Sequence, residues 1–385
     1  MKIAMIGPTW PFRGGIAHYT TLLYKHLKKR HEVRFFAFER QYPGWLFPGR
    51  SDRDPSLAPI LEPGVERTID SMNPVTWLRT AREIVRYGCD AVVLPWWVSF
   101  WAPQFSAIIA YVKSHSNAKI IFICHNVVAH ESRFYDRLLT QWVLKTGDGY
   151  LVHSAEDENN LRRIIPDARI CRRFHPTYDV FDAAPLDHNI CRDLLGLDRV
   201  GHMLLFFGFV RAYKGLKYLL SAMPEILAEI PVTLLVVGEF WKDKDIYLQM
   251  IKDLGIERQV RMVDAYVPNE DVGRYFTAAD LVVQPYISAT GSGVVQMAFG
   301  FNKPVVATTV GSLSEIIAHG ETGFLVPPGD GAAISQAVIQ FFRDDDNTRL
   351  FEENIRNRQY RFSWDHLVAG IESLLGKSMG SSPDL

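Results

Sequence analysis

Ten short, almost purely apolar runs recur along the chain, and the segments between them have the spacing of amphipathic helices. Five runs lie in each half of the sequence, at residues 2–6, 33–38, 91–94, 119–124, 150–152, 203–207, 232–237, 260–263, 281–284 and 305–307. Runs of this kind are typical of strands buried on both faces of a parallel sheet, with the helices as crossovers. We therefore predict an α/β protein made of two doubly wound, Rossmann-like domains in tandem.

A break in this pattern separates the two halves. Between residues 176 and 202, prolines and polar residues interrupt every apolar period. We place the domain boundary within this stretch, which predicts an N-terminal domain over residues 1–178 and a C-terminal domain over residues 179–362.

The end of the chain has a different character. Ser363 is a suitable N-cap for a terminal helix over residues 363–376, which we expect to pack back toward the N-terminal domain. Residues 377–385 are rich in Ser, Gly and Pro, so we expect a disordered tail.

Charge and cysteine content narrow the classes of function. The 385 residues include 42 Lys and Arg against 43 Asp and Glu, so the overall charge predicts no nucleic-acid partner. The four cysteines form no CxxC pair and lie in mostly apolar surroundings, which indicates buried thiols in a reducing compartment. Residues 1–7 form a strand pattern without a basic leader, so we expect a cytoplasmic protein.

One uncharged stretch tests that expectation. Residues 91–112 carry no charged side chain over 22 positions, which is long enough to cross a bilayer. Pro95 and Pro103 oppose a single spanning helix, because a proline inside a helix costs about 3 kcal/mol. We predict instead a strand that ends at Pro95 and a separate helix that begins near Pro103.

Ligands of open parallel sheets bind beyond the carboxyl ends of the strands, so the residues there are candidates for a site. Gly14 and Gly15 follow the first strand and precede a helix, where backbone N–H groups and the helix dipole favour an anion such as phosphate. A simple turn is the alternative. A nicotinamide-dependent dehydrogenase, with Glu39 on the ribose, is disfavoured because Gly7 and Gly14 are too far apart for a pyrophosphate turn.

His125 follows the strand over residues 119–124. A neutral imidazole there can hydrogen-bond a substrate hydroxyl or a leaving group; a loop histidine bonded to backbone is the alternative. A zinc site from His125, His130 and Glu131 lacks both the HExxH spacing and a cysteine ligand. Ser154 and Asp157 occupy capping-box positions at the start of the next helix, which indicates a structural role.

In the second half, Arg211 and Lys214 follow the strand over residues 203–207. They are placed to clamp a diphosphate by charge-assisted hydrogen bonds, and solvated loop cations are the alternative. Farther on, Gly291, Ser292 and Gly293 precede a helix and predict a second anion nest. The two nests together predict one anion bound between the domains.

Five segments of the chain, none specific alone, together resemble the retaining GT-B glycosyltransferases of family 4. They are Gly14-Gly15-Ile16 and residues 207–215, 303–308, 310–315 and 320–328. The resemblance covers nearly the whole chain. It implies two Rossmann-like domains facing a central cleft that holds a nucleotide-sugar.

By position, the resemblance implies that Gly14 and Gly15 face the donor phosphates, that His125 lies near the reacting sugar, and that Gly208 and Lys214 hold the diphosphate. This chain departs from the family at three positions. Phe209 replaces an arginine, for which Arg211 is the expected substitute, and Ala289 and Met297 replace the family's paired glutamates. The chain thus resembles a branch without those carboxylates, in which donor contacts come from small and hydroxyl residues, namely Thr290, Gly291, Ser292 and Gly293.

The function that this resemblance implies is transfer of a sugar from a UDP-, GDP- or ADP-sugar to an acceptor hydroxyl, as in a hexosyltransferase of polysaccharide or glycolipid synthesis. Two alternatives remain: a non-catalytic nucleotide-sugar-binding protein and a GT-B-type nucleotide-sugar epimerase. We expect no metal or other cofactor, because cations and backbone amides are placed to stabilise the leaving diphosphate. Three acidic triplets, at residues 52–54, 243–245 and 344–346, are interpreted as solvated charge.

The acceptor, a glycan or a lipid-linked sugar, is expected on the N-terminal domain. Rings there that can stack on sugars or meet a lipid tail, or else belong to the core, are Trp10, Phe12, Tyr42, Trp45, Phe47, Trp96, Trp97 and Trp101. A basic cluster of Lys25, Lys28, Lys29, Arg30 and Arg34 suggests peripheral contact with the inner face of a membrane, with a solvated helix face as the alternative.

Overall fold

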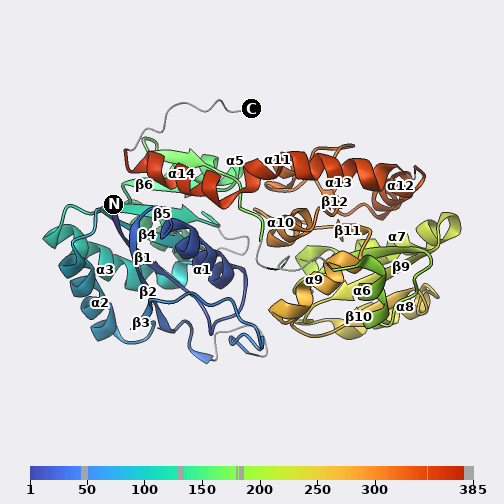
Figure 1. Cartoon of the computed structure of the whole chain (residues 1–385), viewed down its shortest axis with the longest axis horizontal. Helices are drawn as coiled ribbons and strands as arrows, with labels where there is room; N and C mark the ends of the chain where they lie inside the picture. The colour runs from blue at the N-terminus through green and yellow to red at the C-terminus, as the bar shows by residue number, and fades with distance from the viewer. Residues whose placement is uncertain (45–50, 128–133, 179–180, 182–185, 345, 377–385) are drawn as a thin grey trace. The chain divides into compact units, whose positions relative to one another are not determined.

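The computed structural model describes residues 1–44, 51–127, 134–178, 181, 186–344 and 346–376, and its secondary structure alternates strands with helices throughout (Figure 1). The chain divides into two compact units. The first comprises Met1–Asp54, Pro59–His175 and the chain from Ser363 on; the second comprises Pro55–Ala58 and Pro176–Phe362. The predicted tail, residues 377–385, lies outside the described residues.

The first unit is built on a parallel sheet. In the described residues this sheet has seven strands in the order β3-β2-β1-β4-β5-β6-β7. Its strands are β1 (Lys2–Gly7), β2 (Glu32–Arg40), β3 (Val65–Asp70), β4 (Ala91–Trp96), β5 (Lys119–Cys124), β6 (Gly149–Val152) and β7 (Ile170–Arg172). Its helices are α1 (Gly15–Leu27), α2 (Pro74–Tyr87), η2 (Ser99–Trp101), α3 (Ala102–His115), α4 (Phe134–Leu144), α5 (Ala155–Ile164) and α14 (Trp364–Leu374).

The second unit has the same kind of architecture. Its described residues form a six-stranded parallel sheet in the order β10-β9-β8-β11-β12-β13. The strands are β8 (His202–Phe207), β9 (Val232–Val237), β10 (Val260–Val263), β11 (Leu281–Gln284), β12 (Val305–Thr308) and β13 (Gly323–Val326). The helices are α6 (His188–Leu194), η4 (Ala212–Lys214), α7 (Leu216–Glu229), α8 (Lys244–Asp253), α9 (Asn269–Ala278), α10 (Gly293–Gly300), α11 (Leu313–Ile316), α12 (Gly331–Phe342), α13 (Asn347–Asn357) and η5 (Gln359–Phe362).

All ten predicted runs are strands, and the predicted doubly wound α/β fold class is confirmed. Each unit has its own hydrophobic core of strand and helix residues. In the first unit, Trp101 stacks on Phe38 with 4.1 Å between ring centroids and on Phe105 with 5.7 Å. The apolar runs therefore identified both sheets, because the central strands of a parallel sheet are buried on both faces.

The prediction that β4 ends at Pro95 is wrong by one residue. The strand continues through Pro95 to Trp96, which pair with Ile123 and Cys124 of β5. Proline is tolerated there because the register of β4 with β1 on its other side extends only to Val93, so no ladder bond needs the missing N–H. The stretch 91–112 is thus a strand and separate helices, and no described helix is long and apolar enough to span a membrane.

The terminal helix α14 belongs to the first unit. Ser363 caps it by accepting a hydrogen bond from the His366 N–H at 3.1 Å, as expected from the sequence. Buried Leu367, Ile371 and Leu374 form its inner face. Glu372 of α14 lies 3.0 Å from the ring of buried His31, so the helix is held to this unit by apolar packing and by polar contacts.

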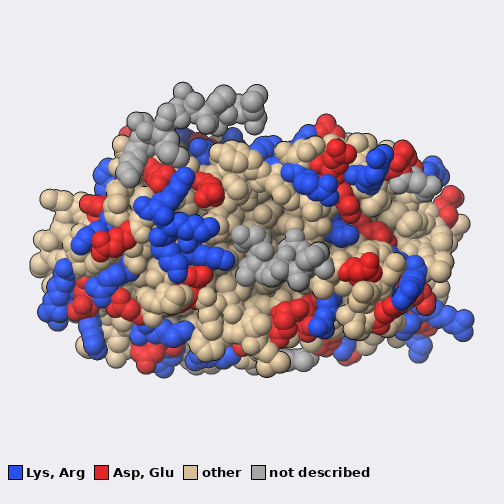
Figure 2. All heavy atoms as spheres, in the orientation of Figure 1, with Lys and Arg blue, Asp and Glu red and all other residues tan. Residues whose placement is uncertain are grey.

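Charges on the surface are mixed in sign. Figure 2 shows Lys and Arg side chains interspersed with Asp and Glu over the visible face. Within the basic cluster of the first unit, the carboxylates of Glu62, Glu372 and Glu66 pair with Lys28, Arg30 and Arg34 in turn. The cluster therefore carries less unbalanced charge than the sequence indicates.

Candidate functional site

The loop before α1 has the backbone geometry of an open helix N-terminus. Gly14 is the N-cap residue at φ 107°, a conformation that favours glycine, and no side chain in the described residues caps this helix end. A Cβ at Gly14 would meet nothing within 4 Å, so its backbone is approachable. This geometry suits an anion at the N–H groups of the first turn of α1, and the anion site at Gly14 and Gly15 stays a prediction.

His125 lies at the carboxyl end of β5, in a cluster of aromatic rings. Its backbone N–H donates to the Trp96 carbonyl at 2.9 Å, which fixes the start of the loop. Its ring meets the Tyr19 ring edge-on with 4.5 Å between centroids. The Nε2 atom is buried and has no hydrogen-bond partner in the described part of the chain. The alternative, in which the backbone hydrogen-bonds the ring, is therefore excluded for this nitrogen.

Two further histidines adjoin His125, and the sequence analysis did not single them out. His153 follows β6 and His175 follows β7, with ring centroids 5.3 Å and 6.2 Å from that of His125. Burial first, and then His153 and His175, hold the pKa of His125 well below its ordinary value. The imidazole is therefore neutral at physiological pH, so one ring nitrogen can donate a hydrogen bond to a sugar hydroxyl and the other can accept one.

The tautomer of His153 follows from one backbone contact. Its Nδ1 donates to the Arg173 carbonyl oxygen at 2.8 Å, which leaves the lone pair on Nε2. Burial lowers the pKa of His153 to about 4. The position of His153, directly after a predicted strand, was the signal that could have identified it. Tyr19 on α1, whose ring lies between these histidines and Trp364 of α14, carried no such signal.

In the second unit, Lys214 begins a series of side-chain hydrogen bonds that runs through Tyr286 to Ser292. Its Nζ donates to the Tyr286 hydroxyl at 3.0 Å, and the Tyr286 and Ser292 hydroxyl oxygens are 3.0 Å apart. Ser292 caps α10 by accepting from the Val295 N–H at 3.2 Å. Burial opposes the charge of Lys214, but Tyr286 and Tyr213 outweigh it, so its pKa is raised and the ammonium stays protonated.

The loop of Lys214 approaches the segment after β11 very closely. Gly215 has φ 73°, and a Cβ there would lie 1.8 Å from the Pro285 carbonyl oxygen, so any side chain would displace the loop. A Cβ built on Gly208 would lie 3.3 Å from the Lys214 Nζ. The structure therefore brings together three residues predicted for the donor site, Gly208, Lys214 and Ser292, and adds Tyr286, which the sequence analysis missed.

The remaining residues of the second nest, Thr290, Gly291 and Gly293, lie close to the turn that contains Ser312. The carbonyl of Thr290, which is largely buried, accepts from the Ser312 N–H at 2.9 Å. A Cβ on Gly291 would lie 3.2 Å from the Ser312 hydroxyl, and Gly293 is the first residue of α10. Ser312, which begins a short helix, is a second hydroxyl beside the predicted nest and was also missed.

Arg211 is positioned by an aromatic ring. Its guanidinium carbon lies 4.0 Å from the centroid of Trp241, a cation–π distance. Its guanidinium forms no hydrogen bond or ion pair among the described residues, so the N–H groups that Trp241 does not cover can reach a ligand. Its charge opposes that of Lys214, but this effect is smaller than those of burial and of the two tyrosines, and the pKa of Lys214 stays raised.

Within the described residues, no group of three or more His, Cys, Asp or Glu side chains is arranged to hold a metal ion. His130, Glu131 and Asp345 lie outside the described residues, as do two of the candidate acceptor rings, Trp45 and Phe47. The expectation that no metal is needed therefore stays a prediction.

Comparisons with known proteins agree with the fold and indicate a family. A family model described as Glycosyltransferase Family 4 matches residues 13–172, and one described as Glycosyl transferases group 1 matches residues 201–344. The D-inositol 3-phosphate glycosyltransferase of Frankia alni is 29% identical over 246 residues, covering 61% of this chain and 60% of that protein. A similarly described enzyme of Catenulispora acidiphila is 28% identical over 236 residues, covering 59% and 56%.

Solved structures match a larger share of the chain than these relatives do. The sucrose-phosphate synthase of Thermosynechococcus elongatus has a TM-score of 0.71 at 20% identity, covering 97% of this chain and 98% of that one. Anabaena HepE in complex with UDP has a TM-score of 0.70 at 17% identity, covering 97% and 99%. At these identities the likeness shows the fold, which is GT-B.

The two family models together match most of the chain, and the protein belongs to family 4 of the GT-B glycosyltransferases. The chain spans 60% or less of the length of the curated relatives named above. Its activity, substrates and partners are therefore matters for a proposal.

Proposed function

We propose that the protein transfers a hexose from a nucleoside-diphosphate sugar to a hydroxyl group of an acceptor. The observation that carries this proposal is the chain from Lys214 through Tyr286 to Ser292, which links a protonated ammonium to the capped N-terminus of α10. An ammonium beside a helix N-terminus is suited to a diphosphate, because both favour negative charge.

The leaving diphosphate gains negative charge as the glycosidic bond breaks. Lys214 and Arg211 are held in place before the reaction, by Tyr286 and by Trp241, so they stabilise the developing charge without reorganising. In the first unit, the neutral ring of His125 is the group that hydrogen-bonds a hydroxyl of the donor sugar. Thr290, Gly291, Ser292 and Gly293 supply the remaining donor contacts in place of the family's glutamates.

The proposal extends to the donor, to the acceptor and to the location of the protein in the cell. The base is that of a UDP-, GDP- or ADP-sugar, and a neighbouring structure, Anabaena HepE, was solved with UDP. The acceptor is a glycan or a lipid-linked sugar of polysaccharide or glycolipid synthesis, and contact with a membrane is peripheral, at the inner face. We place the enzyme in the cytoplasm because its four cysteines are free thiols, three of them buried.

A panel of UDP-, GDP- and ADP-sugars in a thermal-shift assay tests the donor site. One base should raise Tm, since a ligand at about 100 times its Kd stabilises by roughly 2.7 kcal/mol. Lys214→Met should abolish most of that shift, because it removes the ammonium while keeping the length of the side chain. Lys217→Met, an exposed lysine on α7, is the matched control and should keep it. No shift with any donor in the unmodified protein would refute the proposal.

A second candidate is a nucleotide-sugar-binding protein without turnover. The resemblance places Ala289 and Met297 at the positions of the family's paired glutamates, which implies that two carboxylates of the family's donor site are missing. Both candidates predict donor binding through Lys214, and only the first predicts transfer. They are separated by measuring nucleoside-diphosphate release in the presence of acceptors.

A further inference from the structure

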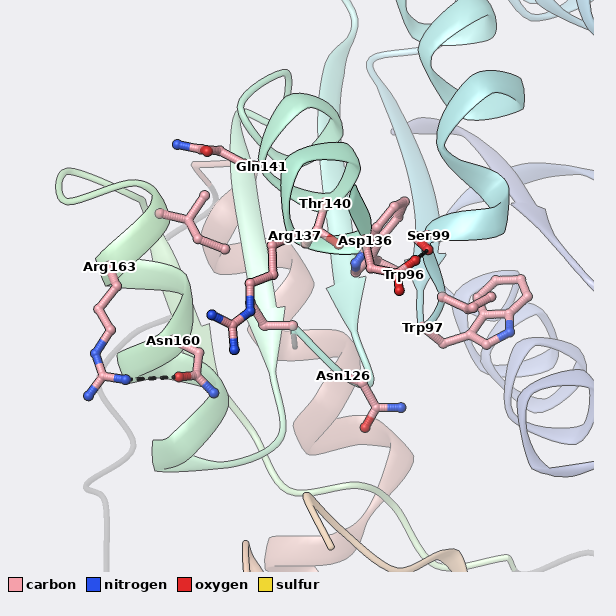
Figure 3. Close-up of a pocket in the computed structure, with 13 residues that line it drawn as sticks. Trp96, Trp97, Ser99, Asn126, Asp136, Arg137, Thr140, Gln141, Asn160 and Arg163 are labelled. Atoms are coloured by element: carbon pink, nitrogen blue, oxygen red, sulfur yellow. Dashed lines mark hydrogen bonds between the residues drawn. The ribbon is translucent and has the colours of Figure 1, made fainter. Parts of the chain in front are cut away.

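A cavity of about 340 Å³ opens in the first unit, beyond the carboxyl ends of β4 and β5 and between α4 and α5 (Figure 3). It adjoins His125, because Asn126 lines the cavity and His125 donates its backbone N–H to Trp96, another lining residue. Its volume is at the lower end of the range for small-molecule sites, roughly 300–1,000 Å³. The space suits one ring with a substituent.

Two guanidinium groups and one carboxylate line this cavity. Figure 3 shows Arg137 extending from α4 toward α5, where Asn160 and Arg163 lie. Arg163 donates to the Asn160 side-chain oxygen at 3.3 Å, and the Arg137 guanidinium has no ion pair or hydrogen bond in the described part of the chain. The carboxylate of Asp136 accepts from the Ser99 hydroxyl. The lining therefore has an excess of positive charge that its own residues do not balance.

The other lining groups are those that recognise hydroxyls. Asn126, Gln141 and Asn160 carry amides, which donate and accept hydrogen bonds together. Trp97 is fixed by donating its indole N–H to the Tyr42 hydroxyl at 2.9 Å, so its ring is a rigid apolar wall. Amides and an indole ring alone would suffice for a neutral sugar or polyol. The two arginines require a further explanation, and their planar groups match phosphate or carboxylate oxygens.

We propose that this cavity binds the acceptor and selects one that carries a phosphate or carboxylate group, which Arg137 and Arg163 hold while the amides bind ring hydroxyls. The inference rests on the proposed function and adds the chemical class of the acceptor to it. It places the reacting hydroxyl on the same molecule, near His125 at the end of β5.

Isothermal titration of the full chain with glucose 6-phosphate, glucuronate and glucose tests the charge selection. We expect the two anions to bind at least about tenfold more tightly than glucose, with the preference shrinking as salt rises. Arg137→Gln and Arg163→Gln should each remove most of the preference. Arg162→Gln is the matched control: it is the exposed neighbour of Arg163 on α5, pairs with Glu158 and does not line the cavity.

Two further experiments show which site binds the anionic probes and whether the anion is carried by a lipid. Lys214→Met should leave the anion preference unchanged, and loss of the preference there alone would assign the probes to the donor site and overturn the proposal. Co-sedimentation with phosphatidylglycerol vesicles, compared with phosphatidylcholine vesicles, shows whether the anion is part of a lipid. Vesicle binding that Arg137→Gln abolishes assigns a lipid phosphate. Binding of the soluble probes without vesicle binding assigns a free sugar acid or sugar phosphate.

Equal affinity for anionic and neutral probes, or no binding of either anion, would overturn the inference. Donor stabilisation in the thermal-shift assay is the independent readout, and Arg137→Gln and Arg163→Gln should preserve it. If the unmodified protein binds the anions and no nucleotide-sugar, the proposed function fails while the cavity's selectivity stands.

Discussion

At the scale of single residues, the neutral ring of His125 makes a kinetic prediction. His125→Ala should lower kcat by about 10²–10⁴-fold, because it removes a hydrogen-bonding group positioned at the reacting sugar, while donor affinity changes little. Steady-state kinetics and titration with donor separate the two quantities. His115→Ala, an exposed histidine at the end of α3, should leave both unchanged. Unaltered kcat in His125→Ala would exclude a catalytic role for this ring.

The second residue-scale prediction concerns His153 and stability. Burial lowers its pKa to about 4 in the folded protein, against an ordinary value of 6.5. Between those values the unfolded chain binds the extra proton, so the free energy of unfolding should fall as pH drops from about 6.5 toward 4. At about 1.4 kcal/mol per pKa unit, His153 contributes a loss of roughly 3 kcal/mol. His125, whose pKa is also lowered, acts in the same direction.

Chemical denaturation at pH 4.5 to 7.5 measures this dependence. His153→Gln keeps a donor for the Arg173 carbonyl and has no charged form, so its free energy of unfolding should depend less steeply on pH. His115→Gln should keep the full dependence of the unmodified protein, because that ring is exposed in both states. The same pH dependence in all three proteins would show that His153 is not the titrating group.

At the scale of elements, the apolar runs predicted the central strands of both sheets and the edge strand β10, and they missed β3 and β7 at the two edges of the first sheet. β3 lies at one edge of the first sheet, pairs only with β2 and contains Glu66, Arg67 and Asp70. β7 lies at the opposite edge and has three residues. An edge strand has one neighbour and an exposed side, so its sequence does not need to be apolar, and a search for apolar runs misses those edge strands that carry charged residues or are very short.

The candidate site shows the same division. Residues directly after a predicted strand, such as His125, and cations in the following loop, such as Lys214, were predicted because chain position alone brings them to the ligand edge. Tyr19 and Tyr286 were not. Tyr19 lies in the middle of α1 and has no exposed surface, so its sequence neighbourhood is that of a core aromatic. Its contacts with three histidine rings depend on tertiary packing that no local pattern encodes.

At the scale of the whole molecule, the chain has two cores, one for each sheet, and the residues that the sequence predicts for a donor site belong to different units. Gly14, Gly15 and His125 belong to the first unit, and Gly208, Lys214 and Ser292 belong to the second. A protein with two such cores can respond to a ligand in one unit without responding in the other. The sequence-based prediction that both glycine nests serve one diphosphate therefore needs a measurement that reports on each unit separately.

Hydrogen exchange with and without the stabilising nucleotide-sugar provides that measurement. In the second unit we expect slower exchange in residues 208–215 and 286–296, where the amides of the Lys214 loop and of α10 would contact the diphosphate. In the first unit we expect slower exchange in residues 14–18, the amides at the start of α1. Residues 74–87 of α2 and 244–253 of α8 are internal controls, one in each unit, and should exchange at unchanged rates. Protection confined to the second unit would keep the Lys214 site and refute a role for Gly14 and Gly15 in holding the donor.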